Sequence, residues 1–223
     1  MIHAVSLADA RAILAHDLLG PDEIAQAFGV PAPVSPPVPF SPEDLERARS
    51  EGEMLVLRLA QVVPDVPLTP LGLIERVPDA FDQARLRQMG YQLKEEWGIA
   101  LEPLARTATC TTGWALVRKA VLEASRNLSF DEQQPVLAAC AAADAPAVRR
   151  RTAVEAMYDT VLYYRVRAER LLGQTWDWCS TLTLDGGFLN VGGFGPHGLQ
   201  ILSYSRGIRH GALGVCPTRQ PGT

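Results

Sequence analysis

The chain has 223 residues, of which 47% are hydrophobic and 21% charged, and its formal net charge is -4. This composition is typical of a globular protein with a buried core, and the acidic balance argues against nucleic acid as a partner because phosphate binding needs a basic surface. No apolar run approaches the roughly 20 residues that a membrane span needs, so we expect no membrane span.

Residues 1–30 predict two short helices. Ser6 has the position of an N-cap with Asp9 three residues later, and Pro21 fits the first turn of the second helix. Charged residues interrupt the apolar pattern of this end, which therefore predicts an amphipathic helix and not a signal peptide. We expect a cytoplasmic protein, with a cell surface or a virion as the destination only by a route that the sequence does not reveal.

Residues 31–42 belong to a proline-rich stretch, VPAPVSPPVPFSP, which predicts a stiff, extended linker. In residues 43–100 the pattern predicts a helix capped by Ser41, a buried strand in MLVLRLA and a helix after Thr69. A further helix is predicted over residues 79–97. We expect this segment to pack on the C-terminal module.

Residues 101–223 alternate between helical and strand patterns. TGWALVRK (112–119) predicts a strand, and capping boxes at Ser129/Glu132 and Thr152/Glu155 predict two helices. After Gly173 the period changes to two, and four short strands are predicted in WDWCSTLTL, FLNVGGF, LQILSY and ALGVC. Together they predict an antiparallel sheet in an α+β module, which sets the fold class as α+β with a helical N-terminal region.

The stretch GFGPHG (193–198) has the spelling of a dinucleotide-binding loop, but the pattern after it is that of a strand. A phosphate loop must open a helix, whose N-terminus supplies the amides that hold the phosphate. We therefore predict a β-hairpin, with Gly195 and Gly198 at positive φ.

No catalytic constellation stands out. The four cysteines form no C-x-x-C motif, which disfavours a zinc site, and His197 and His210 lie in predicted turns without a carboxylate close in sequence. The chain has no nucleophile elbow, H-E-x-x-H motif or phosphate-binding loop of the Walker type. We expect no enzyme activity, no metal and no cofactor.

The second half of the chain resembles the variable proteins of diversity-generating retroelements, notably those of archaeal and small-genome bacterial lineages. The motifs that carry the resemblance are GWALVRK, SFDEQ, a long helix ending in ERLL, NVGGFGPHGLQI and LGVCPTR. GPDEIAQAFGV and PFSPEDLERARSEGEMLVLRL resemble the N-terminal parts of the same group. The resemblance implies a C-type lectin-like fold at the C-terminus. It also implies hypervariable ligand binding, because an error-prone reverse transcriptase rewrites codons for side chains that the last strands and turns display.

Alternation along a strand explains how such a scaffold tolerates change, because one face stays in the core while the other varies. On this reading the inward positions are Val191, Phe194, Leu199, Ile201, Leu213 and Val215. The displayed, ligand-binding positions are Phe188, Asn190, Gly193, His197, Gln200, Leu202, Ser203, Tyr204, Ser205, Arg206, Ile208, His210 and Ala212. Few of them are Asn or Asp, which leaves open whether this copy is diversified.

The expected partner is a macromolecule, either a protein or a glycan. Two other functions stay open from the sequence. The lectin-like fold also resembles that of formylglycine-generating enzymes, in which case Cys179 and Cys216 would be an oxidising cysteine pair. A phage tail adhesin would use the same binding chemistry in a different genomic context.

Overall fold

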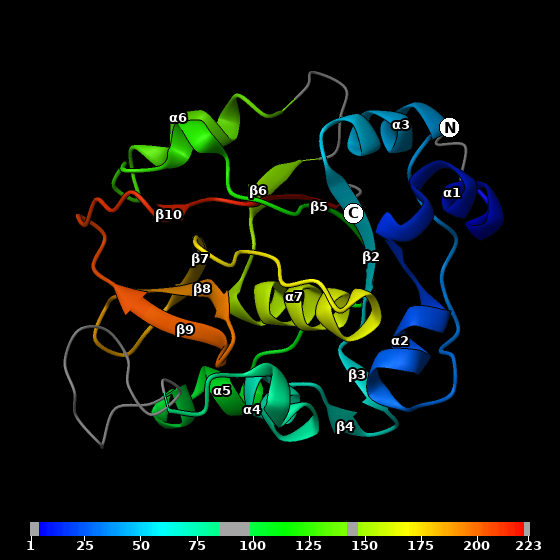
Figure 1. Cartoon of the computed structure of the whole chain (residues 1–223), viewed down its shortest axis with the longest axis horizontal. Helices are drawn as coiled ribbons and strands as arrows, with labels where there is room; N and C mark the ends of the chain where they lie inside the picture. The colour runs from blue at the N-terminus through cyan, green and yellow to red at the C-terminus, as the bar shows by residue number, and fades with distance from the viewer. Residues whose placement is uncertain (1–4, 85–98, 142–146, 221–223) are drawn as a thin grey trace.

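The computed structural model describes residues 5–84, 99–141 and 147–220 (Figure 1). The fold is α+β, as expected. The helices are α1 (Leu7–Leu14), α2 (Pro21–Phe28), α3 (Pro42–Ser50), α4 (Pro70–Arg76), α5 (Leu104–Thr107), α6 (Gln133–Ala138) and α7 (Ala153–Arg167). The strands of the first half are β1 (Leu18–Leu19), β2 (Glu53–Arg58), β3 (Gln61–Val63), β4 (Val66–Pro67) and β5 (Gly113–Arg118). Those of the second half are β6 (Val148–Arg150), β7 (Trp176–Leu182), β8 (Phe188–Gly195), β9 (Gly198–Tyr204), β10 (Leu213–Gly214) and β11 (Pro217–Arg219).

The predicted helix starts are mostly confirmed by side-chain caps. Ser6, Ser41, Thr69 and Thr152 each accept a hydrogen bond from a backbone N–H in the first turn of the helix that follows. Such caps satisfy donors that have no partner inside the helix. Ser129 and Glu132 also bond reciprocally, but they close a turn, and α6 begins only at Gln133.

The helix predicted over residues 79–97 is wrong at its start, and its residues 85–97 lie outside the described residues. Residues 78–80 form a single 3₁₀ turn, after which Phe81 pairs with Leu199 at the edge of β9. The Asp82 N–H donates to Leu199 O at 3.0 Å. Pairing with a strand edge therefore overrides the local helical pattern.

The proline-rich segment is extended, as expected, yet it packs against the protein and does not act as a spacer. Val38 forms an isolated bridge with Val5, and both Val38 and Phe40 are buried. The indole N–H of Trp114 donates to Pro36 O at 2.9 Å. These contacts fix the segment along the core.

A five-stranded sheet in the order β1-β2-β5-β11-β6 forms the framework. β1 runs parallel to β2, whereas β2 and β11 both run antiparallel to β5. Thr218 of β11 pairs with Val117 on one side and with Arg149 on the other. Strands from three of the segments distinguished in the sequence thus share one sheet.

The second sheet has the order β10-β7-β8-β9 and contains the four strands predicted after Gly173. β7, β8 and β9 are antiparallel, but β10 pairs parallel to β7. The all-antiparallel expectation is therefore wrong at β10. After β9 the chain first passes through residues 205–212, re-enters beside Trp176, and continues into β11 of the framework sheet.

Helix α7 lies at the centre of the molecule, between β2 of the framework sheet and β7 and β8 of the second sheet (Figure 1). Its residues from Ala153 to Tyr163 are buried. The main hydrophobic core continues from Val5 to Ile201 around this helix. One face of the second sheet is therefore committed to the core, and only the opposite face is available for other contacts.

Candidate functional site

The outer face of the second sheet, opposite α7, gathers most of the residues that the sequence marked for ligand binding. Along β9, Leu199 and Ile201 are buried in the main core, whereas Gln200, Leu202 and Tyr204 alternate with them and are half-buried. All six predicted inward positions are buried, at 2% exposure or less, but Leu213 belongs to a smaller cluster on the outer face and not to the main core. The period-two pattern therefore separates buried from half-buried side chains on β9, as expected.

The outward side chains of β8 are covered, which corrects the expectation that they are displayed. Phe188 is only 9% exposed because its ring stacks on Phe130, with ring centroids 3.9 Å apart. Phe130 also meets Trp178 edge-on at 5.3 Å. These rings and Leu213 form a second, smaller hydrophobic cluster on the outer face, with Trp176, Tyr204 and Ile208 packed against it.

Asn190 is likewise buried, with no exposed surface. It stands between Trp178 on β7 and Leu202 on β9, beneath the second cluster. Among the described residues, neither the oxygen nor the nitrogen of its amide has a hydrogen-bond partner, and the same holds for the indole nitrogens of Trp176 and Trp178. The expectation that Asn190 is displayed is therefore wrong, because the side chain is fully buried between its neighbours on β7 and β9.

Gly193 is buried at an irregularity of the β8–β9 pairing and offers no side chain for binding. Its φ is +56°, and a Cβ atom there would lie 2.4 Å from Cζ2 of Trp176. A varied residue at this position would therefore be strained. The hairpin itself is confirmed, with Gly198 at φ +115°, but Gly195 does not adopt the expected positive φ.

Residues 205–212 form a loop that folds over the edge of the outer face. Phe130 N–H donates to Arg206 O at 3.1 Å, and Asn127 N–H donates to His210 O at 3.2 Å. Ion pairs Arg206–Asp131 and Arg209–Glu132 tie the loop to the start of α6. Ser205, Arg206 and His210 are exposed, and Ile208 and Ala212 are half-buried.

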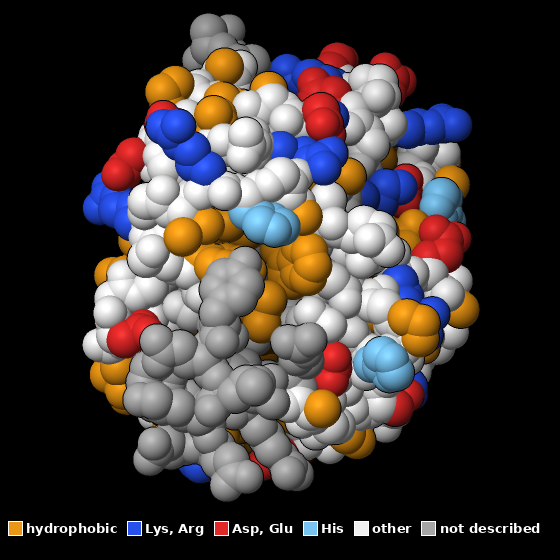
Figure 2. All heavy atoms as spheres, turned by 60° about the vertical axis from the view of Figure 1, so that its left-hand side comes forward, with side chains coloured by type: hydrophobic (Ala, Val, Ile, Leu, Met, Phe, Trp, Pro, Cys, Tyr) orange, Lys and Arg blue, Asp and Glu red, His pale blue; other side chains and the backbone are white. Residues whose placement is uncertain are grey.

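Two other predicted positions lie away from this loop. His197 is exposed in the β8–β9 turn, at the opposite end of β9 from His210, so the two histidines do not form one site. Ser203 pairs with Leu189, and its hydroxyl lies 3.3 Å from that of Thr183, near the β7–β8 turn. Figure 2 shows the side of the molecule that lies to the left in Figure 1. Hydrophobic side chains surround a hollow there, and a histidine lies beside them.

A buried ionic network fixes the second sheet to the framework. Asp159 of α7 accepts hydrogen bonds from Arg58 of β2 at 2.9 and 2.6 Å and from Arg151 at 3.1 Å. Arg151 also donates to Asp177 of β7 at 2.8 Å, and the other oxygen of Asp177 accepts from Cys216 N–H at 2.7 Å. The network therefore joins β2, α7, β7 and the crossing between β10 and β11.

The cysteines named for a possible oxidase are both fully buried. Cys179 and Cys216 are free thiols with no exposed surface, and burial raises the pKa of each well above its usual range. A thiol is reactive mainly as a thiolate. Their position beside Asp177 is that of core residues, so nothing in this geometry presents sulfur to a substrate.

The sequence reasoning missed the cover itself. Phe130 stands in SFDEQ, which has the pattern of a capped helix start, and nothing in that pattern indicates that its ring packs on the outer face. It also missed Arg150, one of three successive arginines that end β6 and turn into α7. The one sequence feature that points to Arg150 is the run of three arginines in a short strand. A strand of this kind is usually partly buried, and a buried arginine needs hydrogen-bond partners.

In residues 5–84, 99–141 and 147–220, no three His, Cys, Asp or Glu side chains are grouped as for a metal ion, and no helix is long and apolar enough to cross a bilayer. No protein-family model matches the chain, and no curated protein or solved structure is significantly similar to it.

Proposed function

We propose that this protein is a recognition protein that binds a macromolecular ligand, protein or glycan, through the outer face of its second sheet. On this proposal residues 101–223 are a C-type lectin-like module, and the chain is the target of a diversity-generating retroelement. It acts by binding and not by catalysis.

The observation that carries the proposal is the division of side chains along β9 and the following loop. Leu199 and Ile201 hold the core, while Gln200, Leu202 and Tyr204 point away from it and remain partly accessible. Substitution on the outward side leaves the packing of α7 unchanged. Partly exposed aromatic and aliphatic side chains beside an exposed loop are characteristic of interaction sites.

The ionic network beneath the sheet supports the same proposal. Arg58, Asp159, Arg151 and Asp177 are all at most 2% exposed and hold β7 against α7 and β2. A binding surface works best when its backbone is rigid, because less conformational entropy is lost on binding. The outward positions can therefore vary while β7, α7 and β2 keep their places.

The burial pattern narrows the set of residues that such a surface uses. Phe188, Asn190 and Gly193 belong to the fixed structure. The positions left for ligand contact are Gln200, Leu202, Tyr204, Ser205, Arg206, Ile208, His210 and Ala212, with His197 and Ser203 at the periphery.

A comparison of copies of this gene within one genome tests the diversification. We expect substitutions to concentrate at positions 200–212, to spare Leu199 and Ile201, and to spare Asn190 and Gly193 as well. An even scatter along the chain would remove the basis for diversification. Neighbouring genes distinguish the contexts, since a reverse transcriptase with a template repeat favours the retroelement and tail genes favour a phage adhesin.

A display experiment tests binding independently. One library randomises Gln200, Leu202, Tyr204, Ile208 and His210, and a matched library randomises Leu199, Ile201, Val191, Leu213 and Val215. We expect the first library to remain mostly folded and to yield binders to a panel of proteins and glycans. If both libraries unfold equally, or if the outward library yields no binder, the outer face is not a display surface.

A further inference from the structure

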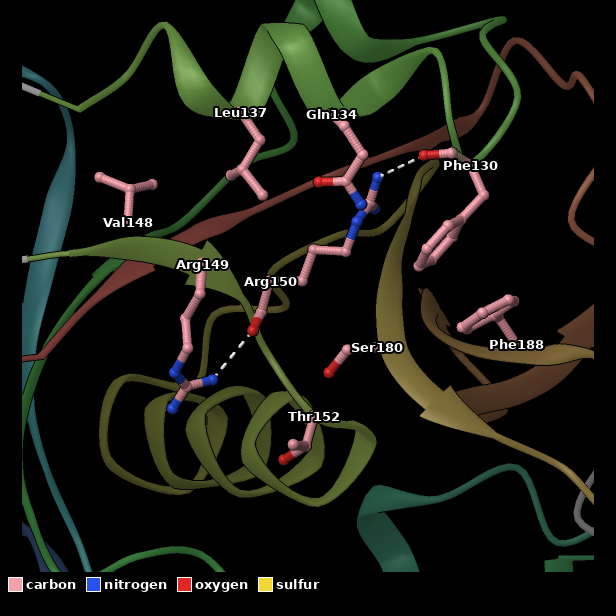
Figure 3. Close-up of a pocket in the computed structure, with 9 residues that line it drawn as sticks. All are labelled: Phe130, Gln134, Leu137, Val148, Arg149, Arg150, Thr152, Ser180 and Phe188. Carbon is pink, nitrogen blue, oxygen red and sulfur yellow. Dashed lines mark hydrogen bonds between the residues drawn. The ribbon is translucent and has the colours of Figure 1, made fainter.

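A pocket of about 560 Å³ opens beside the second sheet, between α6, β6 and the start of α7 (Figure 3). Phe130 and Phe188 form one wall, and Leu137 and Val148 form the opposite one, with Ser180 at its rim. None of the outward residues of β9 or of residues 205–212 lines it. Its volume is in the range typical of pockets for small molecules.

The side chain of Arg150 extends through this pocket from β6 toward Phe130 (Figure 3). The residue is only 4% exposed, and its guanidinium lies 4.0 Å from the centre of the Phe130 ring. It donates to Gln133 Oε1 at 2.9 Å, Trp178 O at 3.0 Å and Phe130 O at 2.9 Å. All three acceptors are neutral.

Arg150 differs in this respect from the other deeply buried arginines. Arg58, Arg151 and Arg219 each pair with at least one carboxylate. Within the described ranges no carboxylate forms an ion pair with Arg150, and its Nε has no hydrogen-bond partner. A buried cation without a counter-ion is costly, and proteins normally pair such charges or use them to hold a ligand.

The charge of Arg150 persists at neutral pH. Burial lowers the pKa of Arg150 to about 10, which still leaves the guanidinium protonated at pH 7. Asp177 and Asp131 oppose this lowering only in part, and Arg149, the other cation that lines the pocket, is paired with Glu155 at 2.6 Å. Arg150 is therefore the lining cation without a direct carboxylate partner among the described residues, and the walls beside it are mainly aromatic and aliphatic carbon. One charge matches one carboxylate, whereas a phosphate dianion would keep a negative charge against apolar walls.

We propose that this pocket binds a small monocarboxylate with an apolar body. The carboxylate lies beside Arg150, and the apolar body lies against Phe130, Phe188 and Leu137. Gln134, exposed at the pocket and without a side-chain hydrogen bond in the part of the chain described, supplies a further donor that turns toward the ligand. This site shares Phe130 and Phe188 with the cluster on the outer face, but it contains none of the positions left there for ligand contact and does not depend on the proposed recognition function.

Ligand-observed NMR titration with phenylacetate, with its neutral isostere phenylacetamide and with inorganic phosphate tests the proposal. We expect saturable binding of phenylacetate, at least about tenfold tighter than that of phenylacetamide, because a hydrogen-bonded charge pair is worth about that factor. Phosphate is expected not to compete. Equal binding of the acid and the amide, or no saturable binding of the acid, overturns the proposal.

Two variants and a control separate the charge from the scaffold. Arg150→Gln should abolish the preference for the acid over the amide, a readout that a merely structural role of Arg150 does not move. Arg49→Gln, at an exposed position of α3, should leave the preference unchanged. If Arg150→Gln still binds phenylacetate more tightly than phenylacetamide, a group other than Arg150 recognises the carboxylate and the proposal is wrong.

Because Arg150 also holds the backbone of Phe130, its replacement can disturb the fold. Ser180→Trp is the second variant, since Ser180 is an exposed residue at the rim and a tryptophan there fills the pocket. We expect Ser180→Trp to lose phenylacetate binding while its thermal midpoint stays that of the parent. Undiminished binding in Ser180→Trp places the ligand elsewhere and refutes the assignment.

Discussion

Replacement of Asp159 by Asn tests whether the buried ionic network holds the second sheet to the framework sheet. Asp159 has no exposed surface and accepts three hydrogen bonds, two from Arg58 and one from Arg151. The amide keeps the shape of the side chain but removes the charge, and its NH₂ group faces a guanidinium donor. The buried guanidinium groups of Arg58 and Arg151 then lose one of the carboxylates that neutralise them.

Removal of one partner from a buried ion pair typically costs about 3–5 kcal/mol. Domains of ordinary stability have a free energy of unfolding of about 5–15 kcal/mol, so Asp159→Asn should lose roughly a fifth of it or more. With a urea dependence of about 2 kcal/mol per molar, the unfolding midpoint falls by roughly 2 M. Urea titration followed by far-ultraviolet circular dichroism measures this shift.

The matched control is Asp79→Asn. Asp79 pairs with Arg165 at 3.2 Å, but the two side chains are 65% and 37% exposed, so this pair should contribute less than about 1 kcal/mol. If Asp159→Asn lowers stability no more than Asp79→Asn does, the network does not anchor the sheet. The ionic network then gives the second sheet no rigid support, and the proposed recognition function loses that basis.

Three further predictions concern the sheet and its surroundings. Asn190→Leu should raise the free energy of unfolding by about 1 kcal/mol, since it removes a buried amide that has no hydrogen-bond partner in the part of the chain described; a loss of that size in urea titration would instead show that the amide is satisfied in solution. Gly198→Ala should cost more than about 2 kcal/mol, because φ is +115° and a Cβ would lie 2.3 Å from the Phe81 carbonyl carbon, whereas Gly207→Ala, which has open space, should be nearly neutral in the same titration. Burial raises the pKa of Glu155, but hydrogen bonds and charges from neighbouring arginines outweigh it and lower the pKa from 4.5 to about 2. Its contribution of about 3 kcal/mol is therefore complete above pH 4.5 and lost as the pH falls toward 2; a Glu155→Gln protein whose stability drops as steeply over that window would contradict this account.

Local chemistry was sufficient to predict many elements of the fold from sequence. The caps at Ser6, Ser41 and Thr152 and the alternation of Leu199 with Gln200 depend only on nearby residues, so they could be read directly. The parallel course of β10 depends on where the chain re-enters after the 205–212 loop, and no local pattern encodes that.

The burial of the outward β8 residues was unpredictable for a similar reason. Phe188 and Asn190 have the correct period for an exposed face, but both are buried, and the ring that stacks on Phe188 belongs to Phe130, almost sixty positions earlier. Arg150 likewise gives no local sign that its three hydrogen-bond acceptors are neutral. Contacts between distant segments decide both cases.

The central place of β11 in the framework sheet has a consequence for faulty gene copies. Thr218 is translated after residues 188–212, yet it pairs with both Val117 and Arg149. A stop codon or frameshift anywhere from 188 to 212 therefore deletes the strand that joins β5 to β6 in the framework sheet. Such a chain leaves two strand edges unpaired, and we expect it to be degraded rather than to accumulate as a truncated protein.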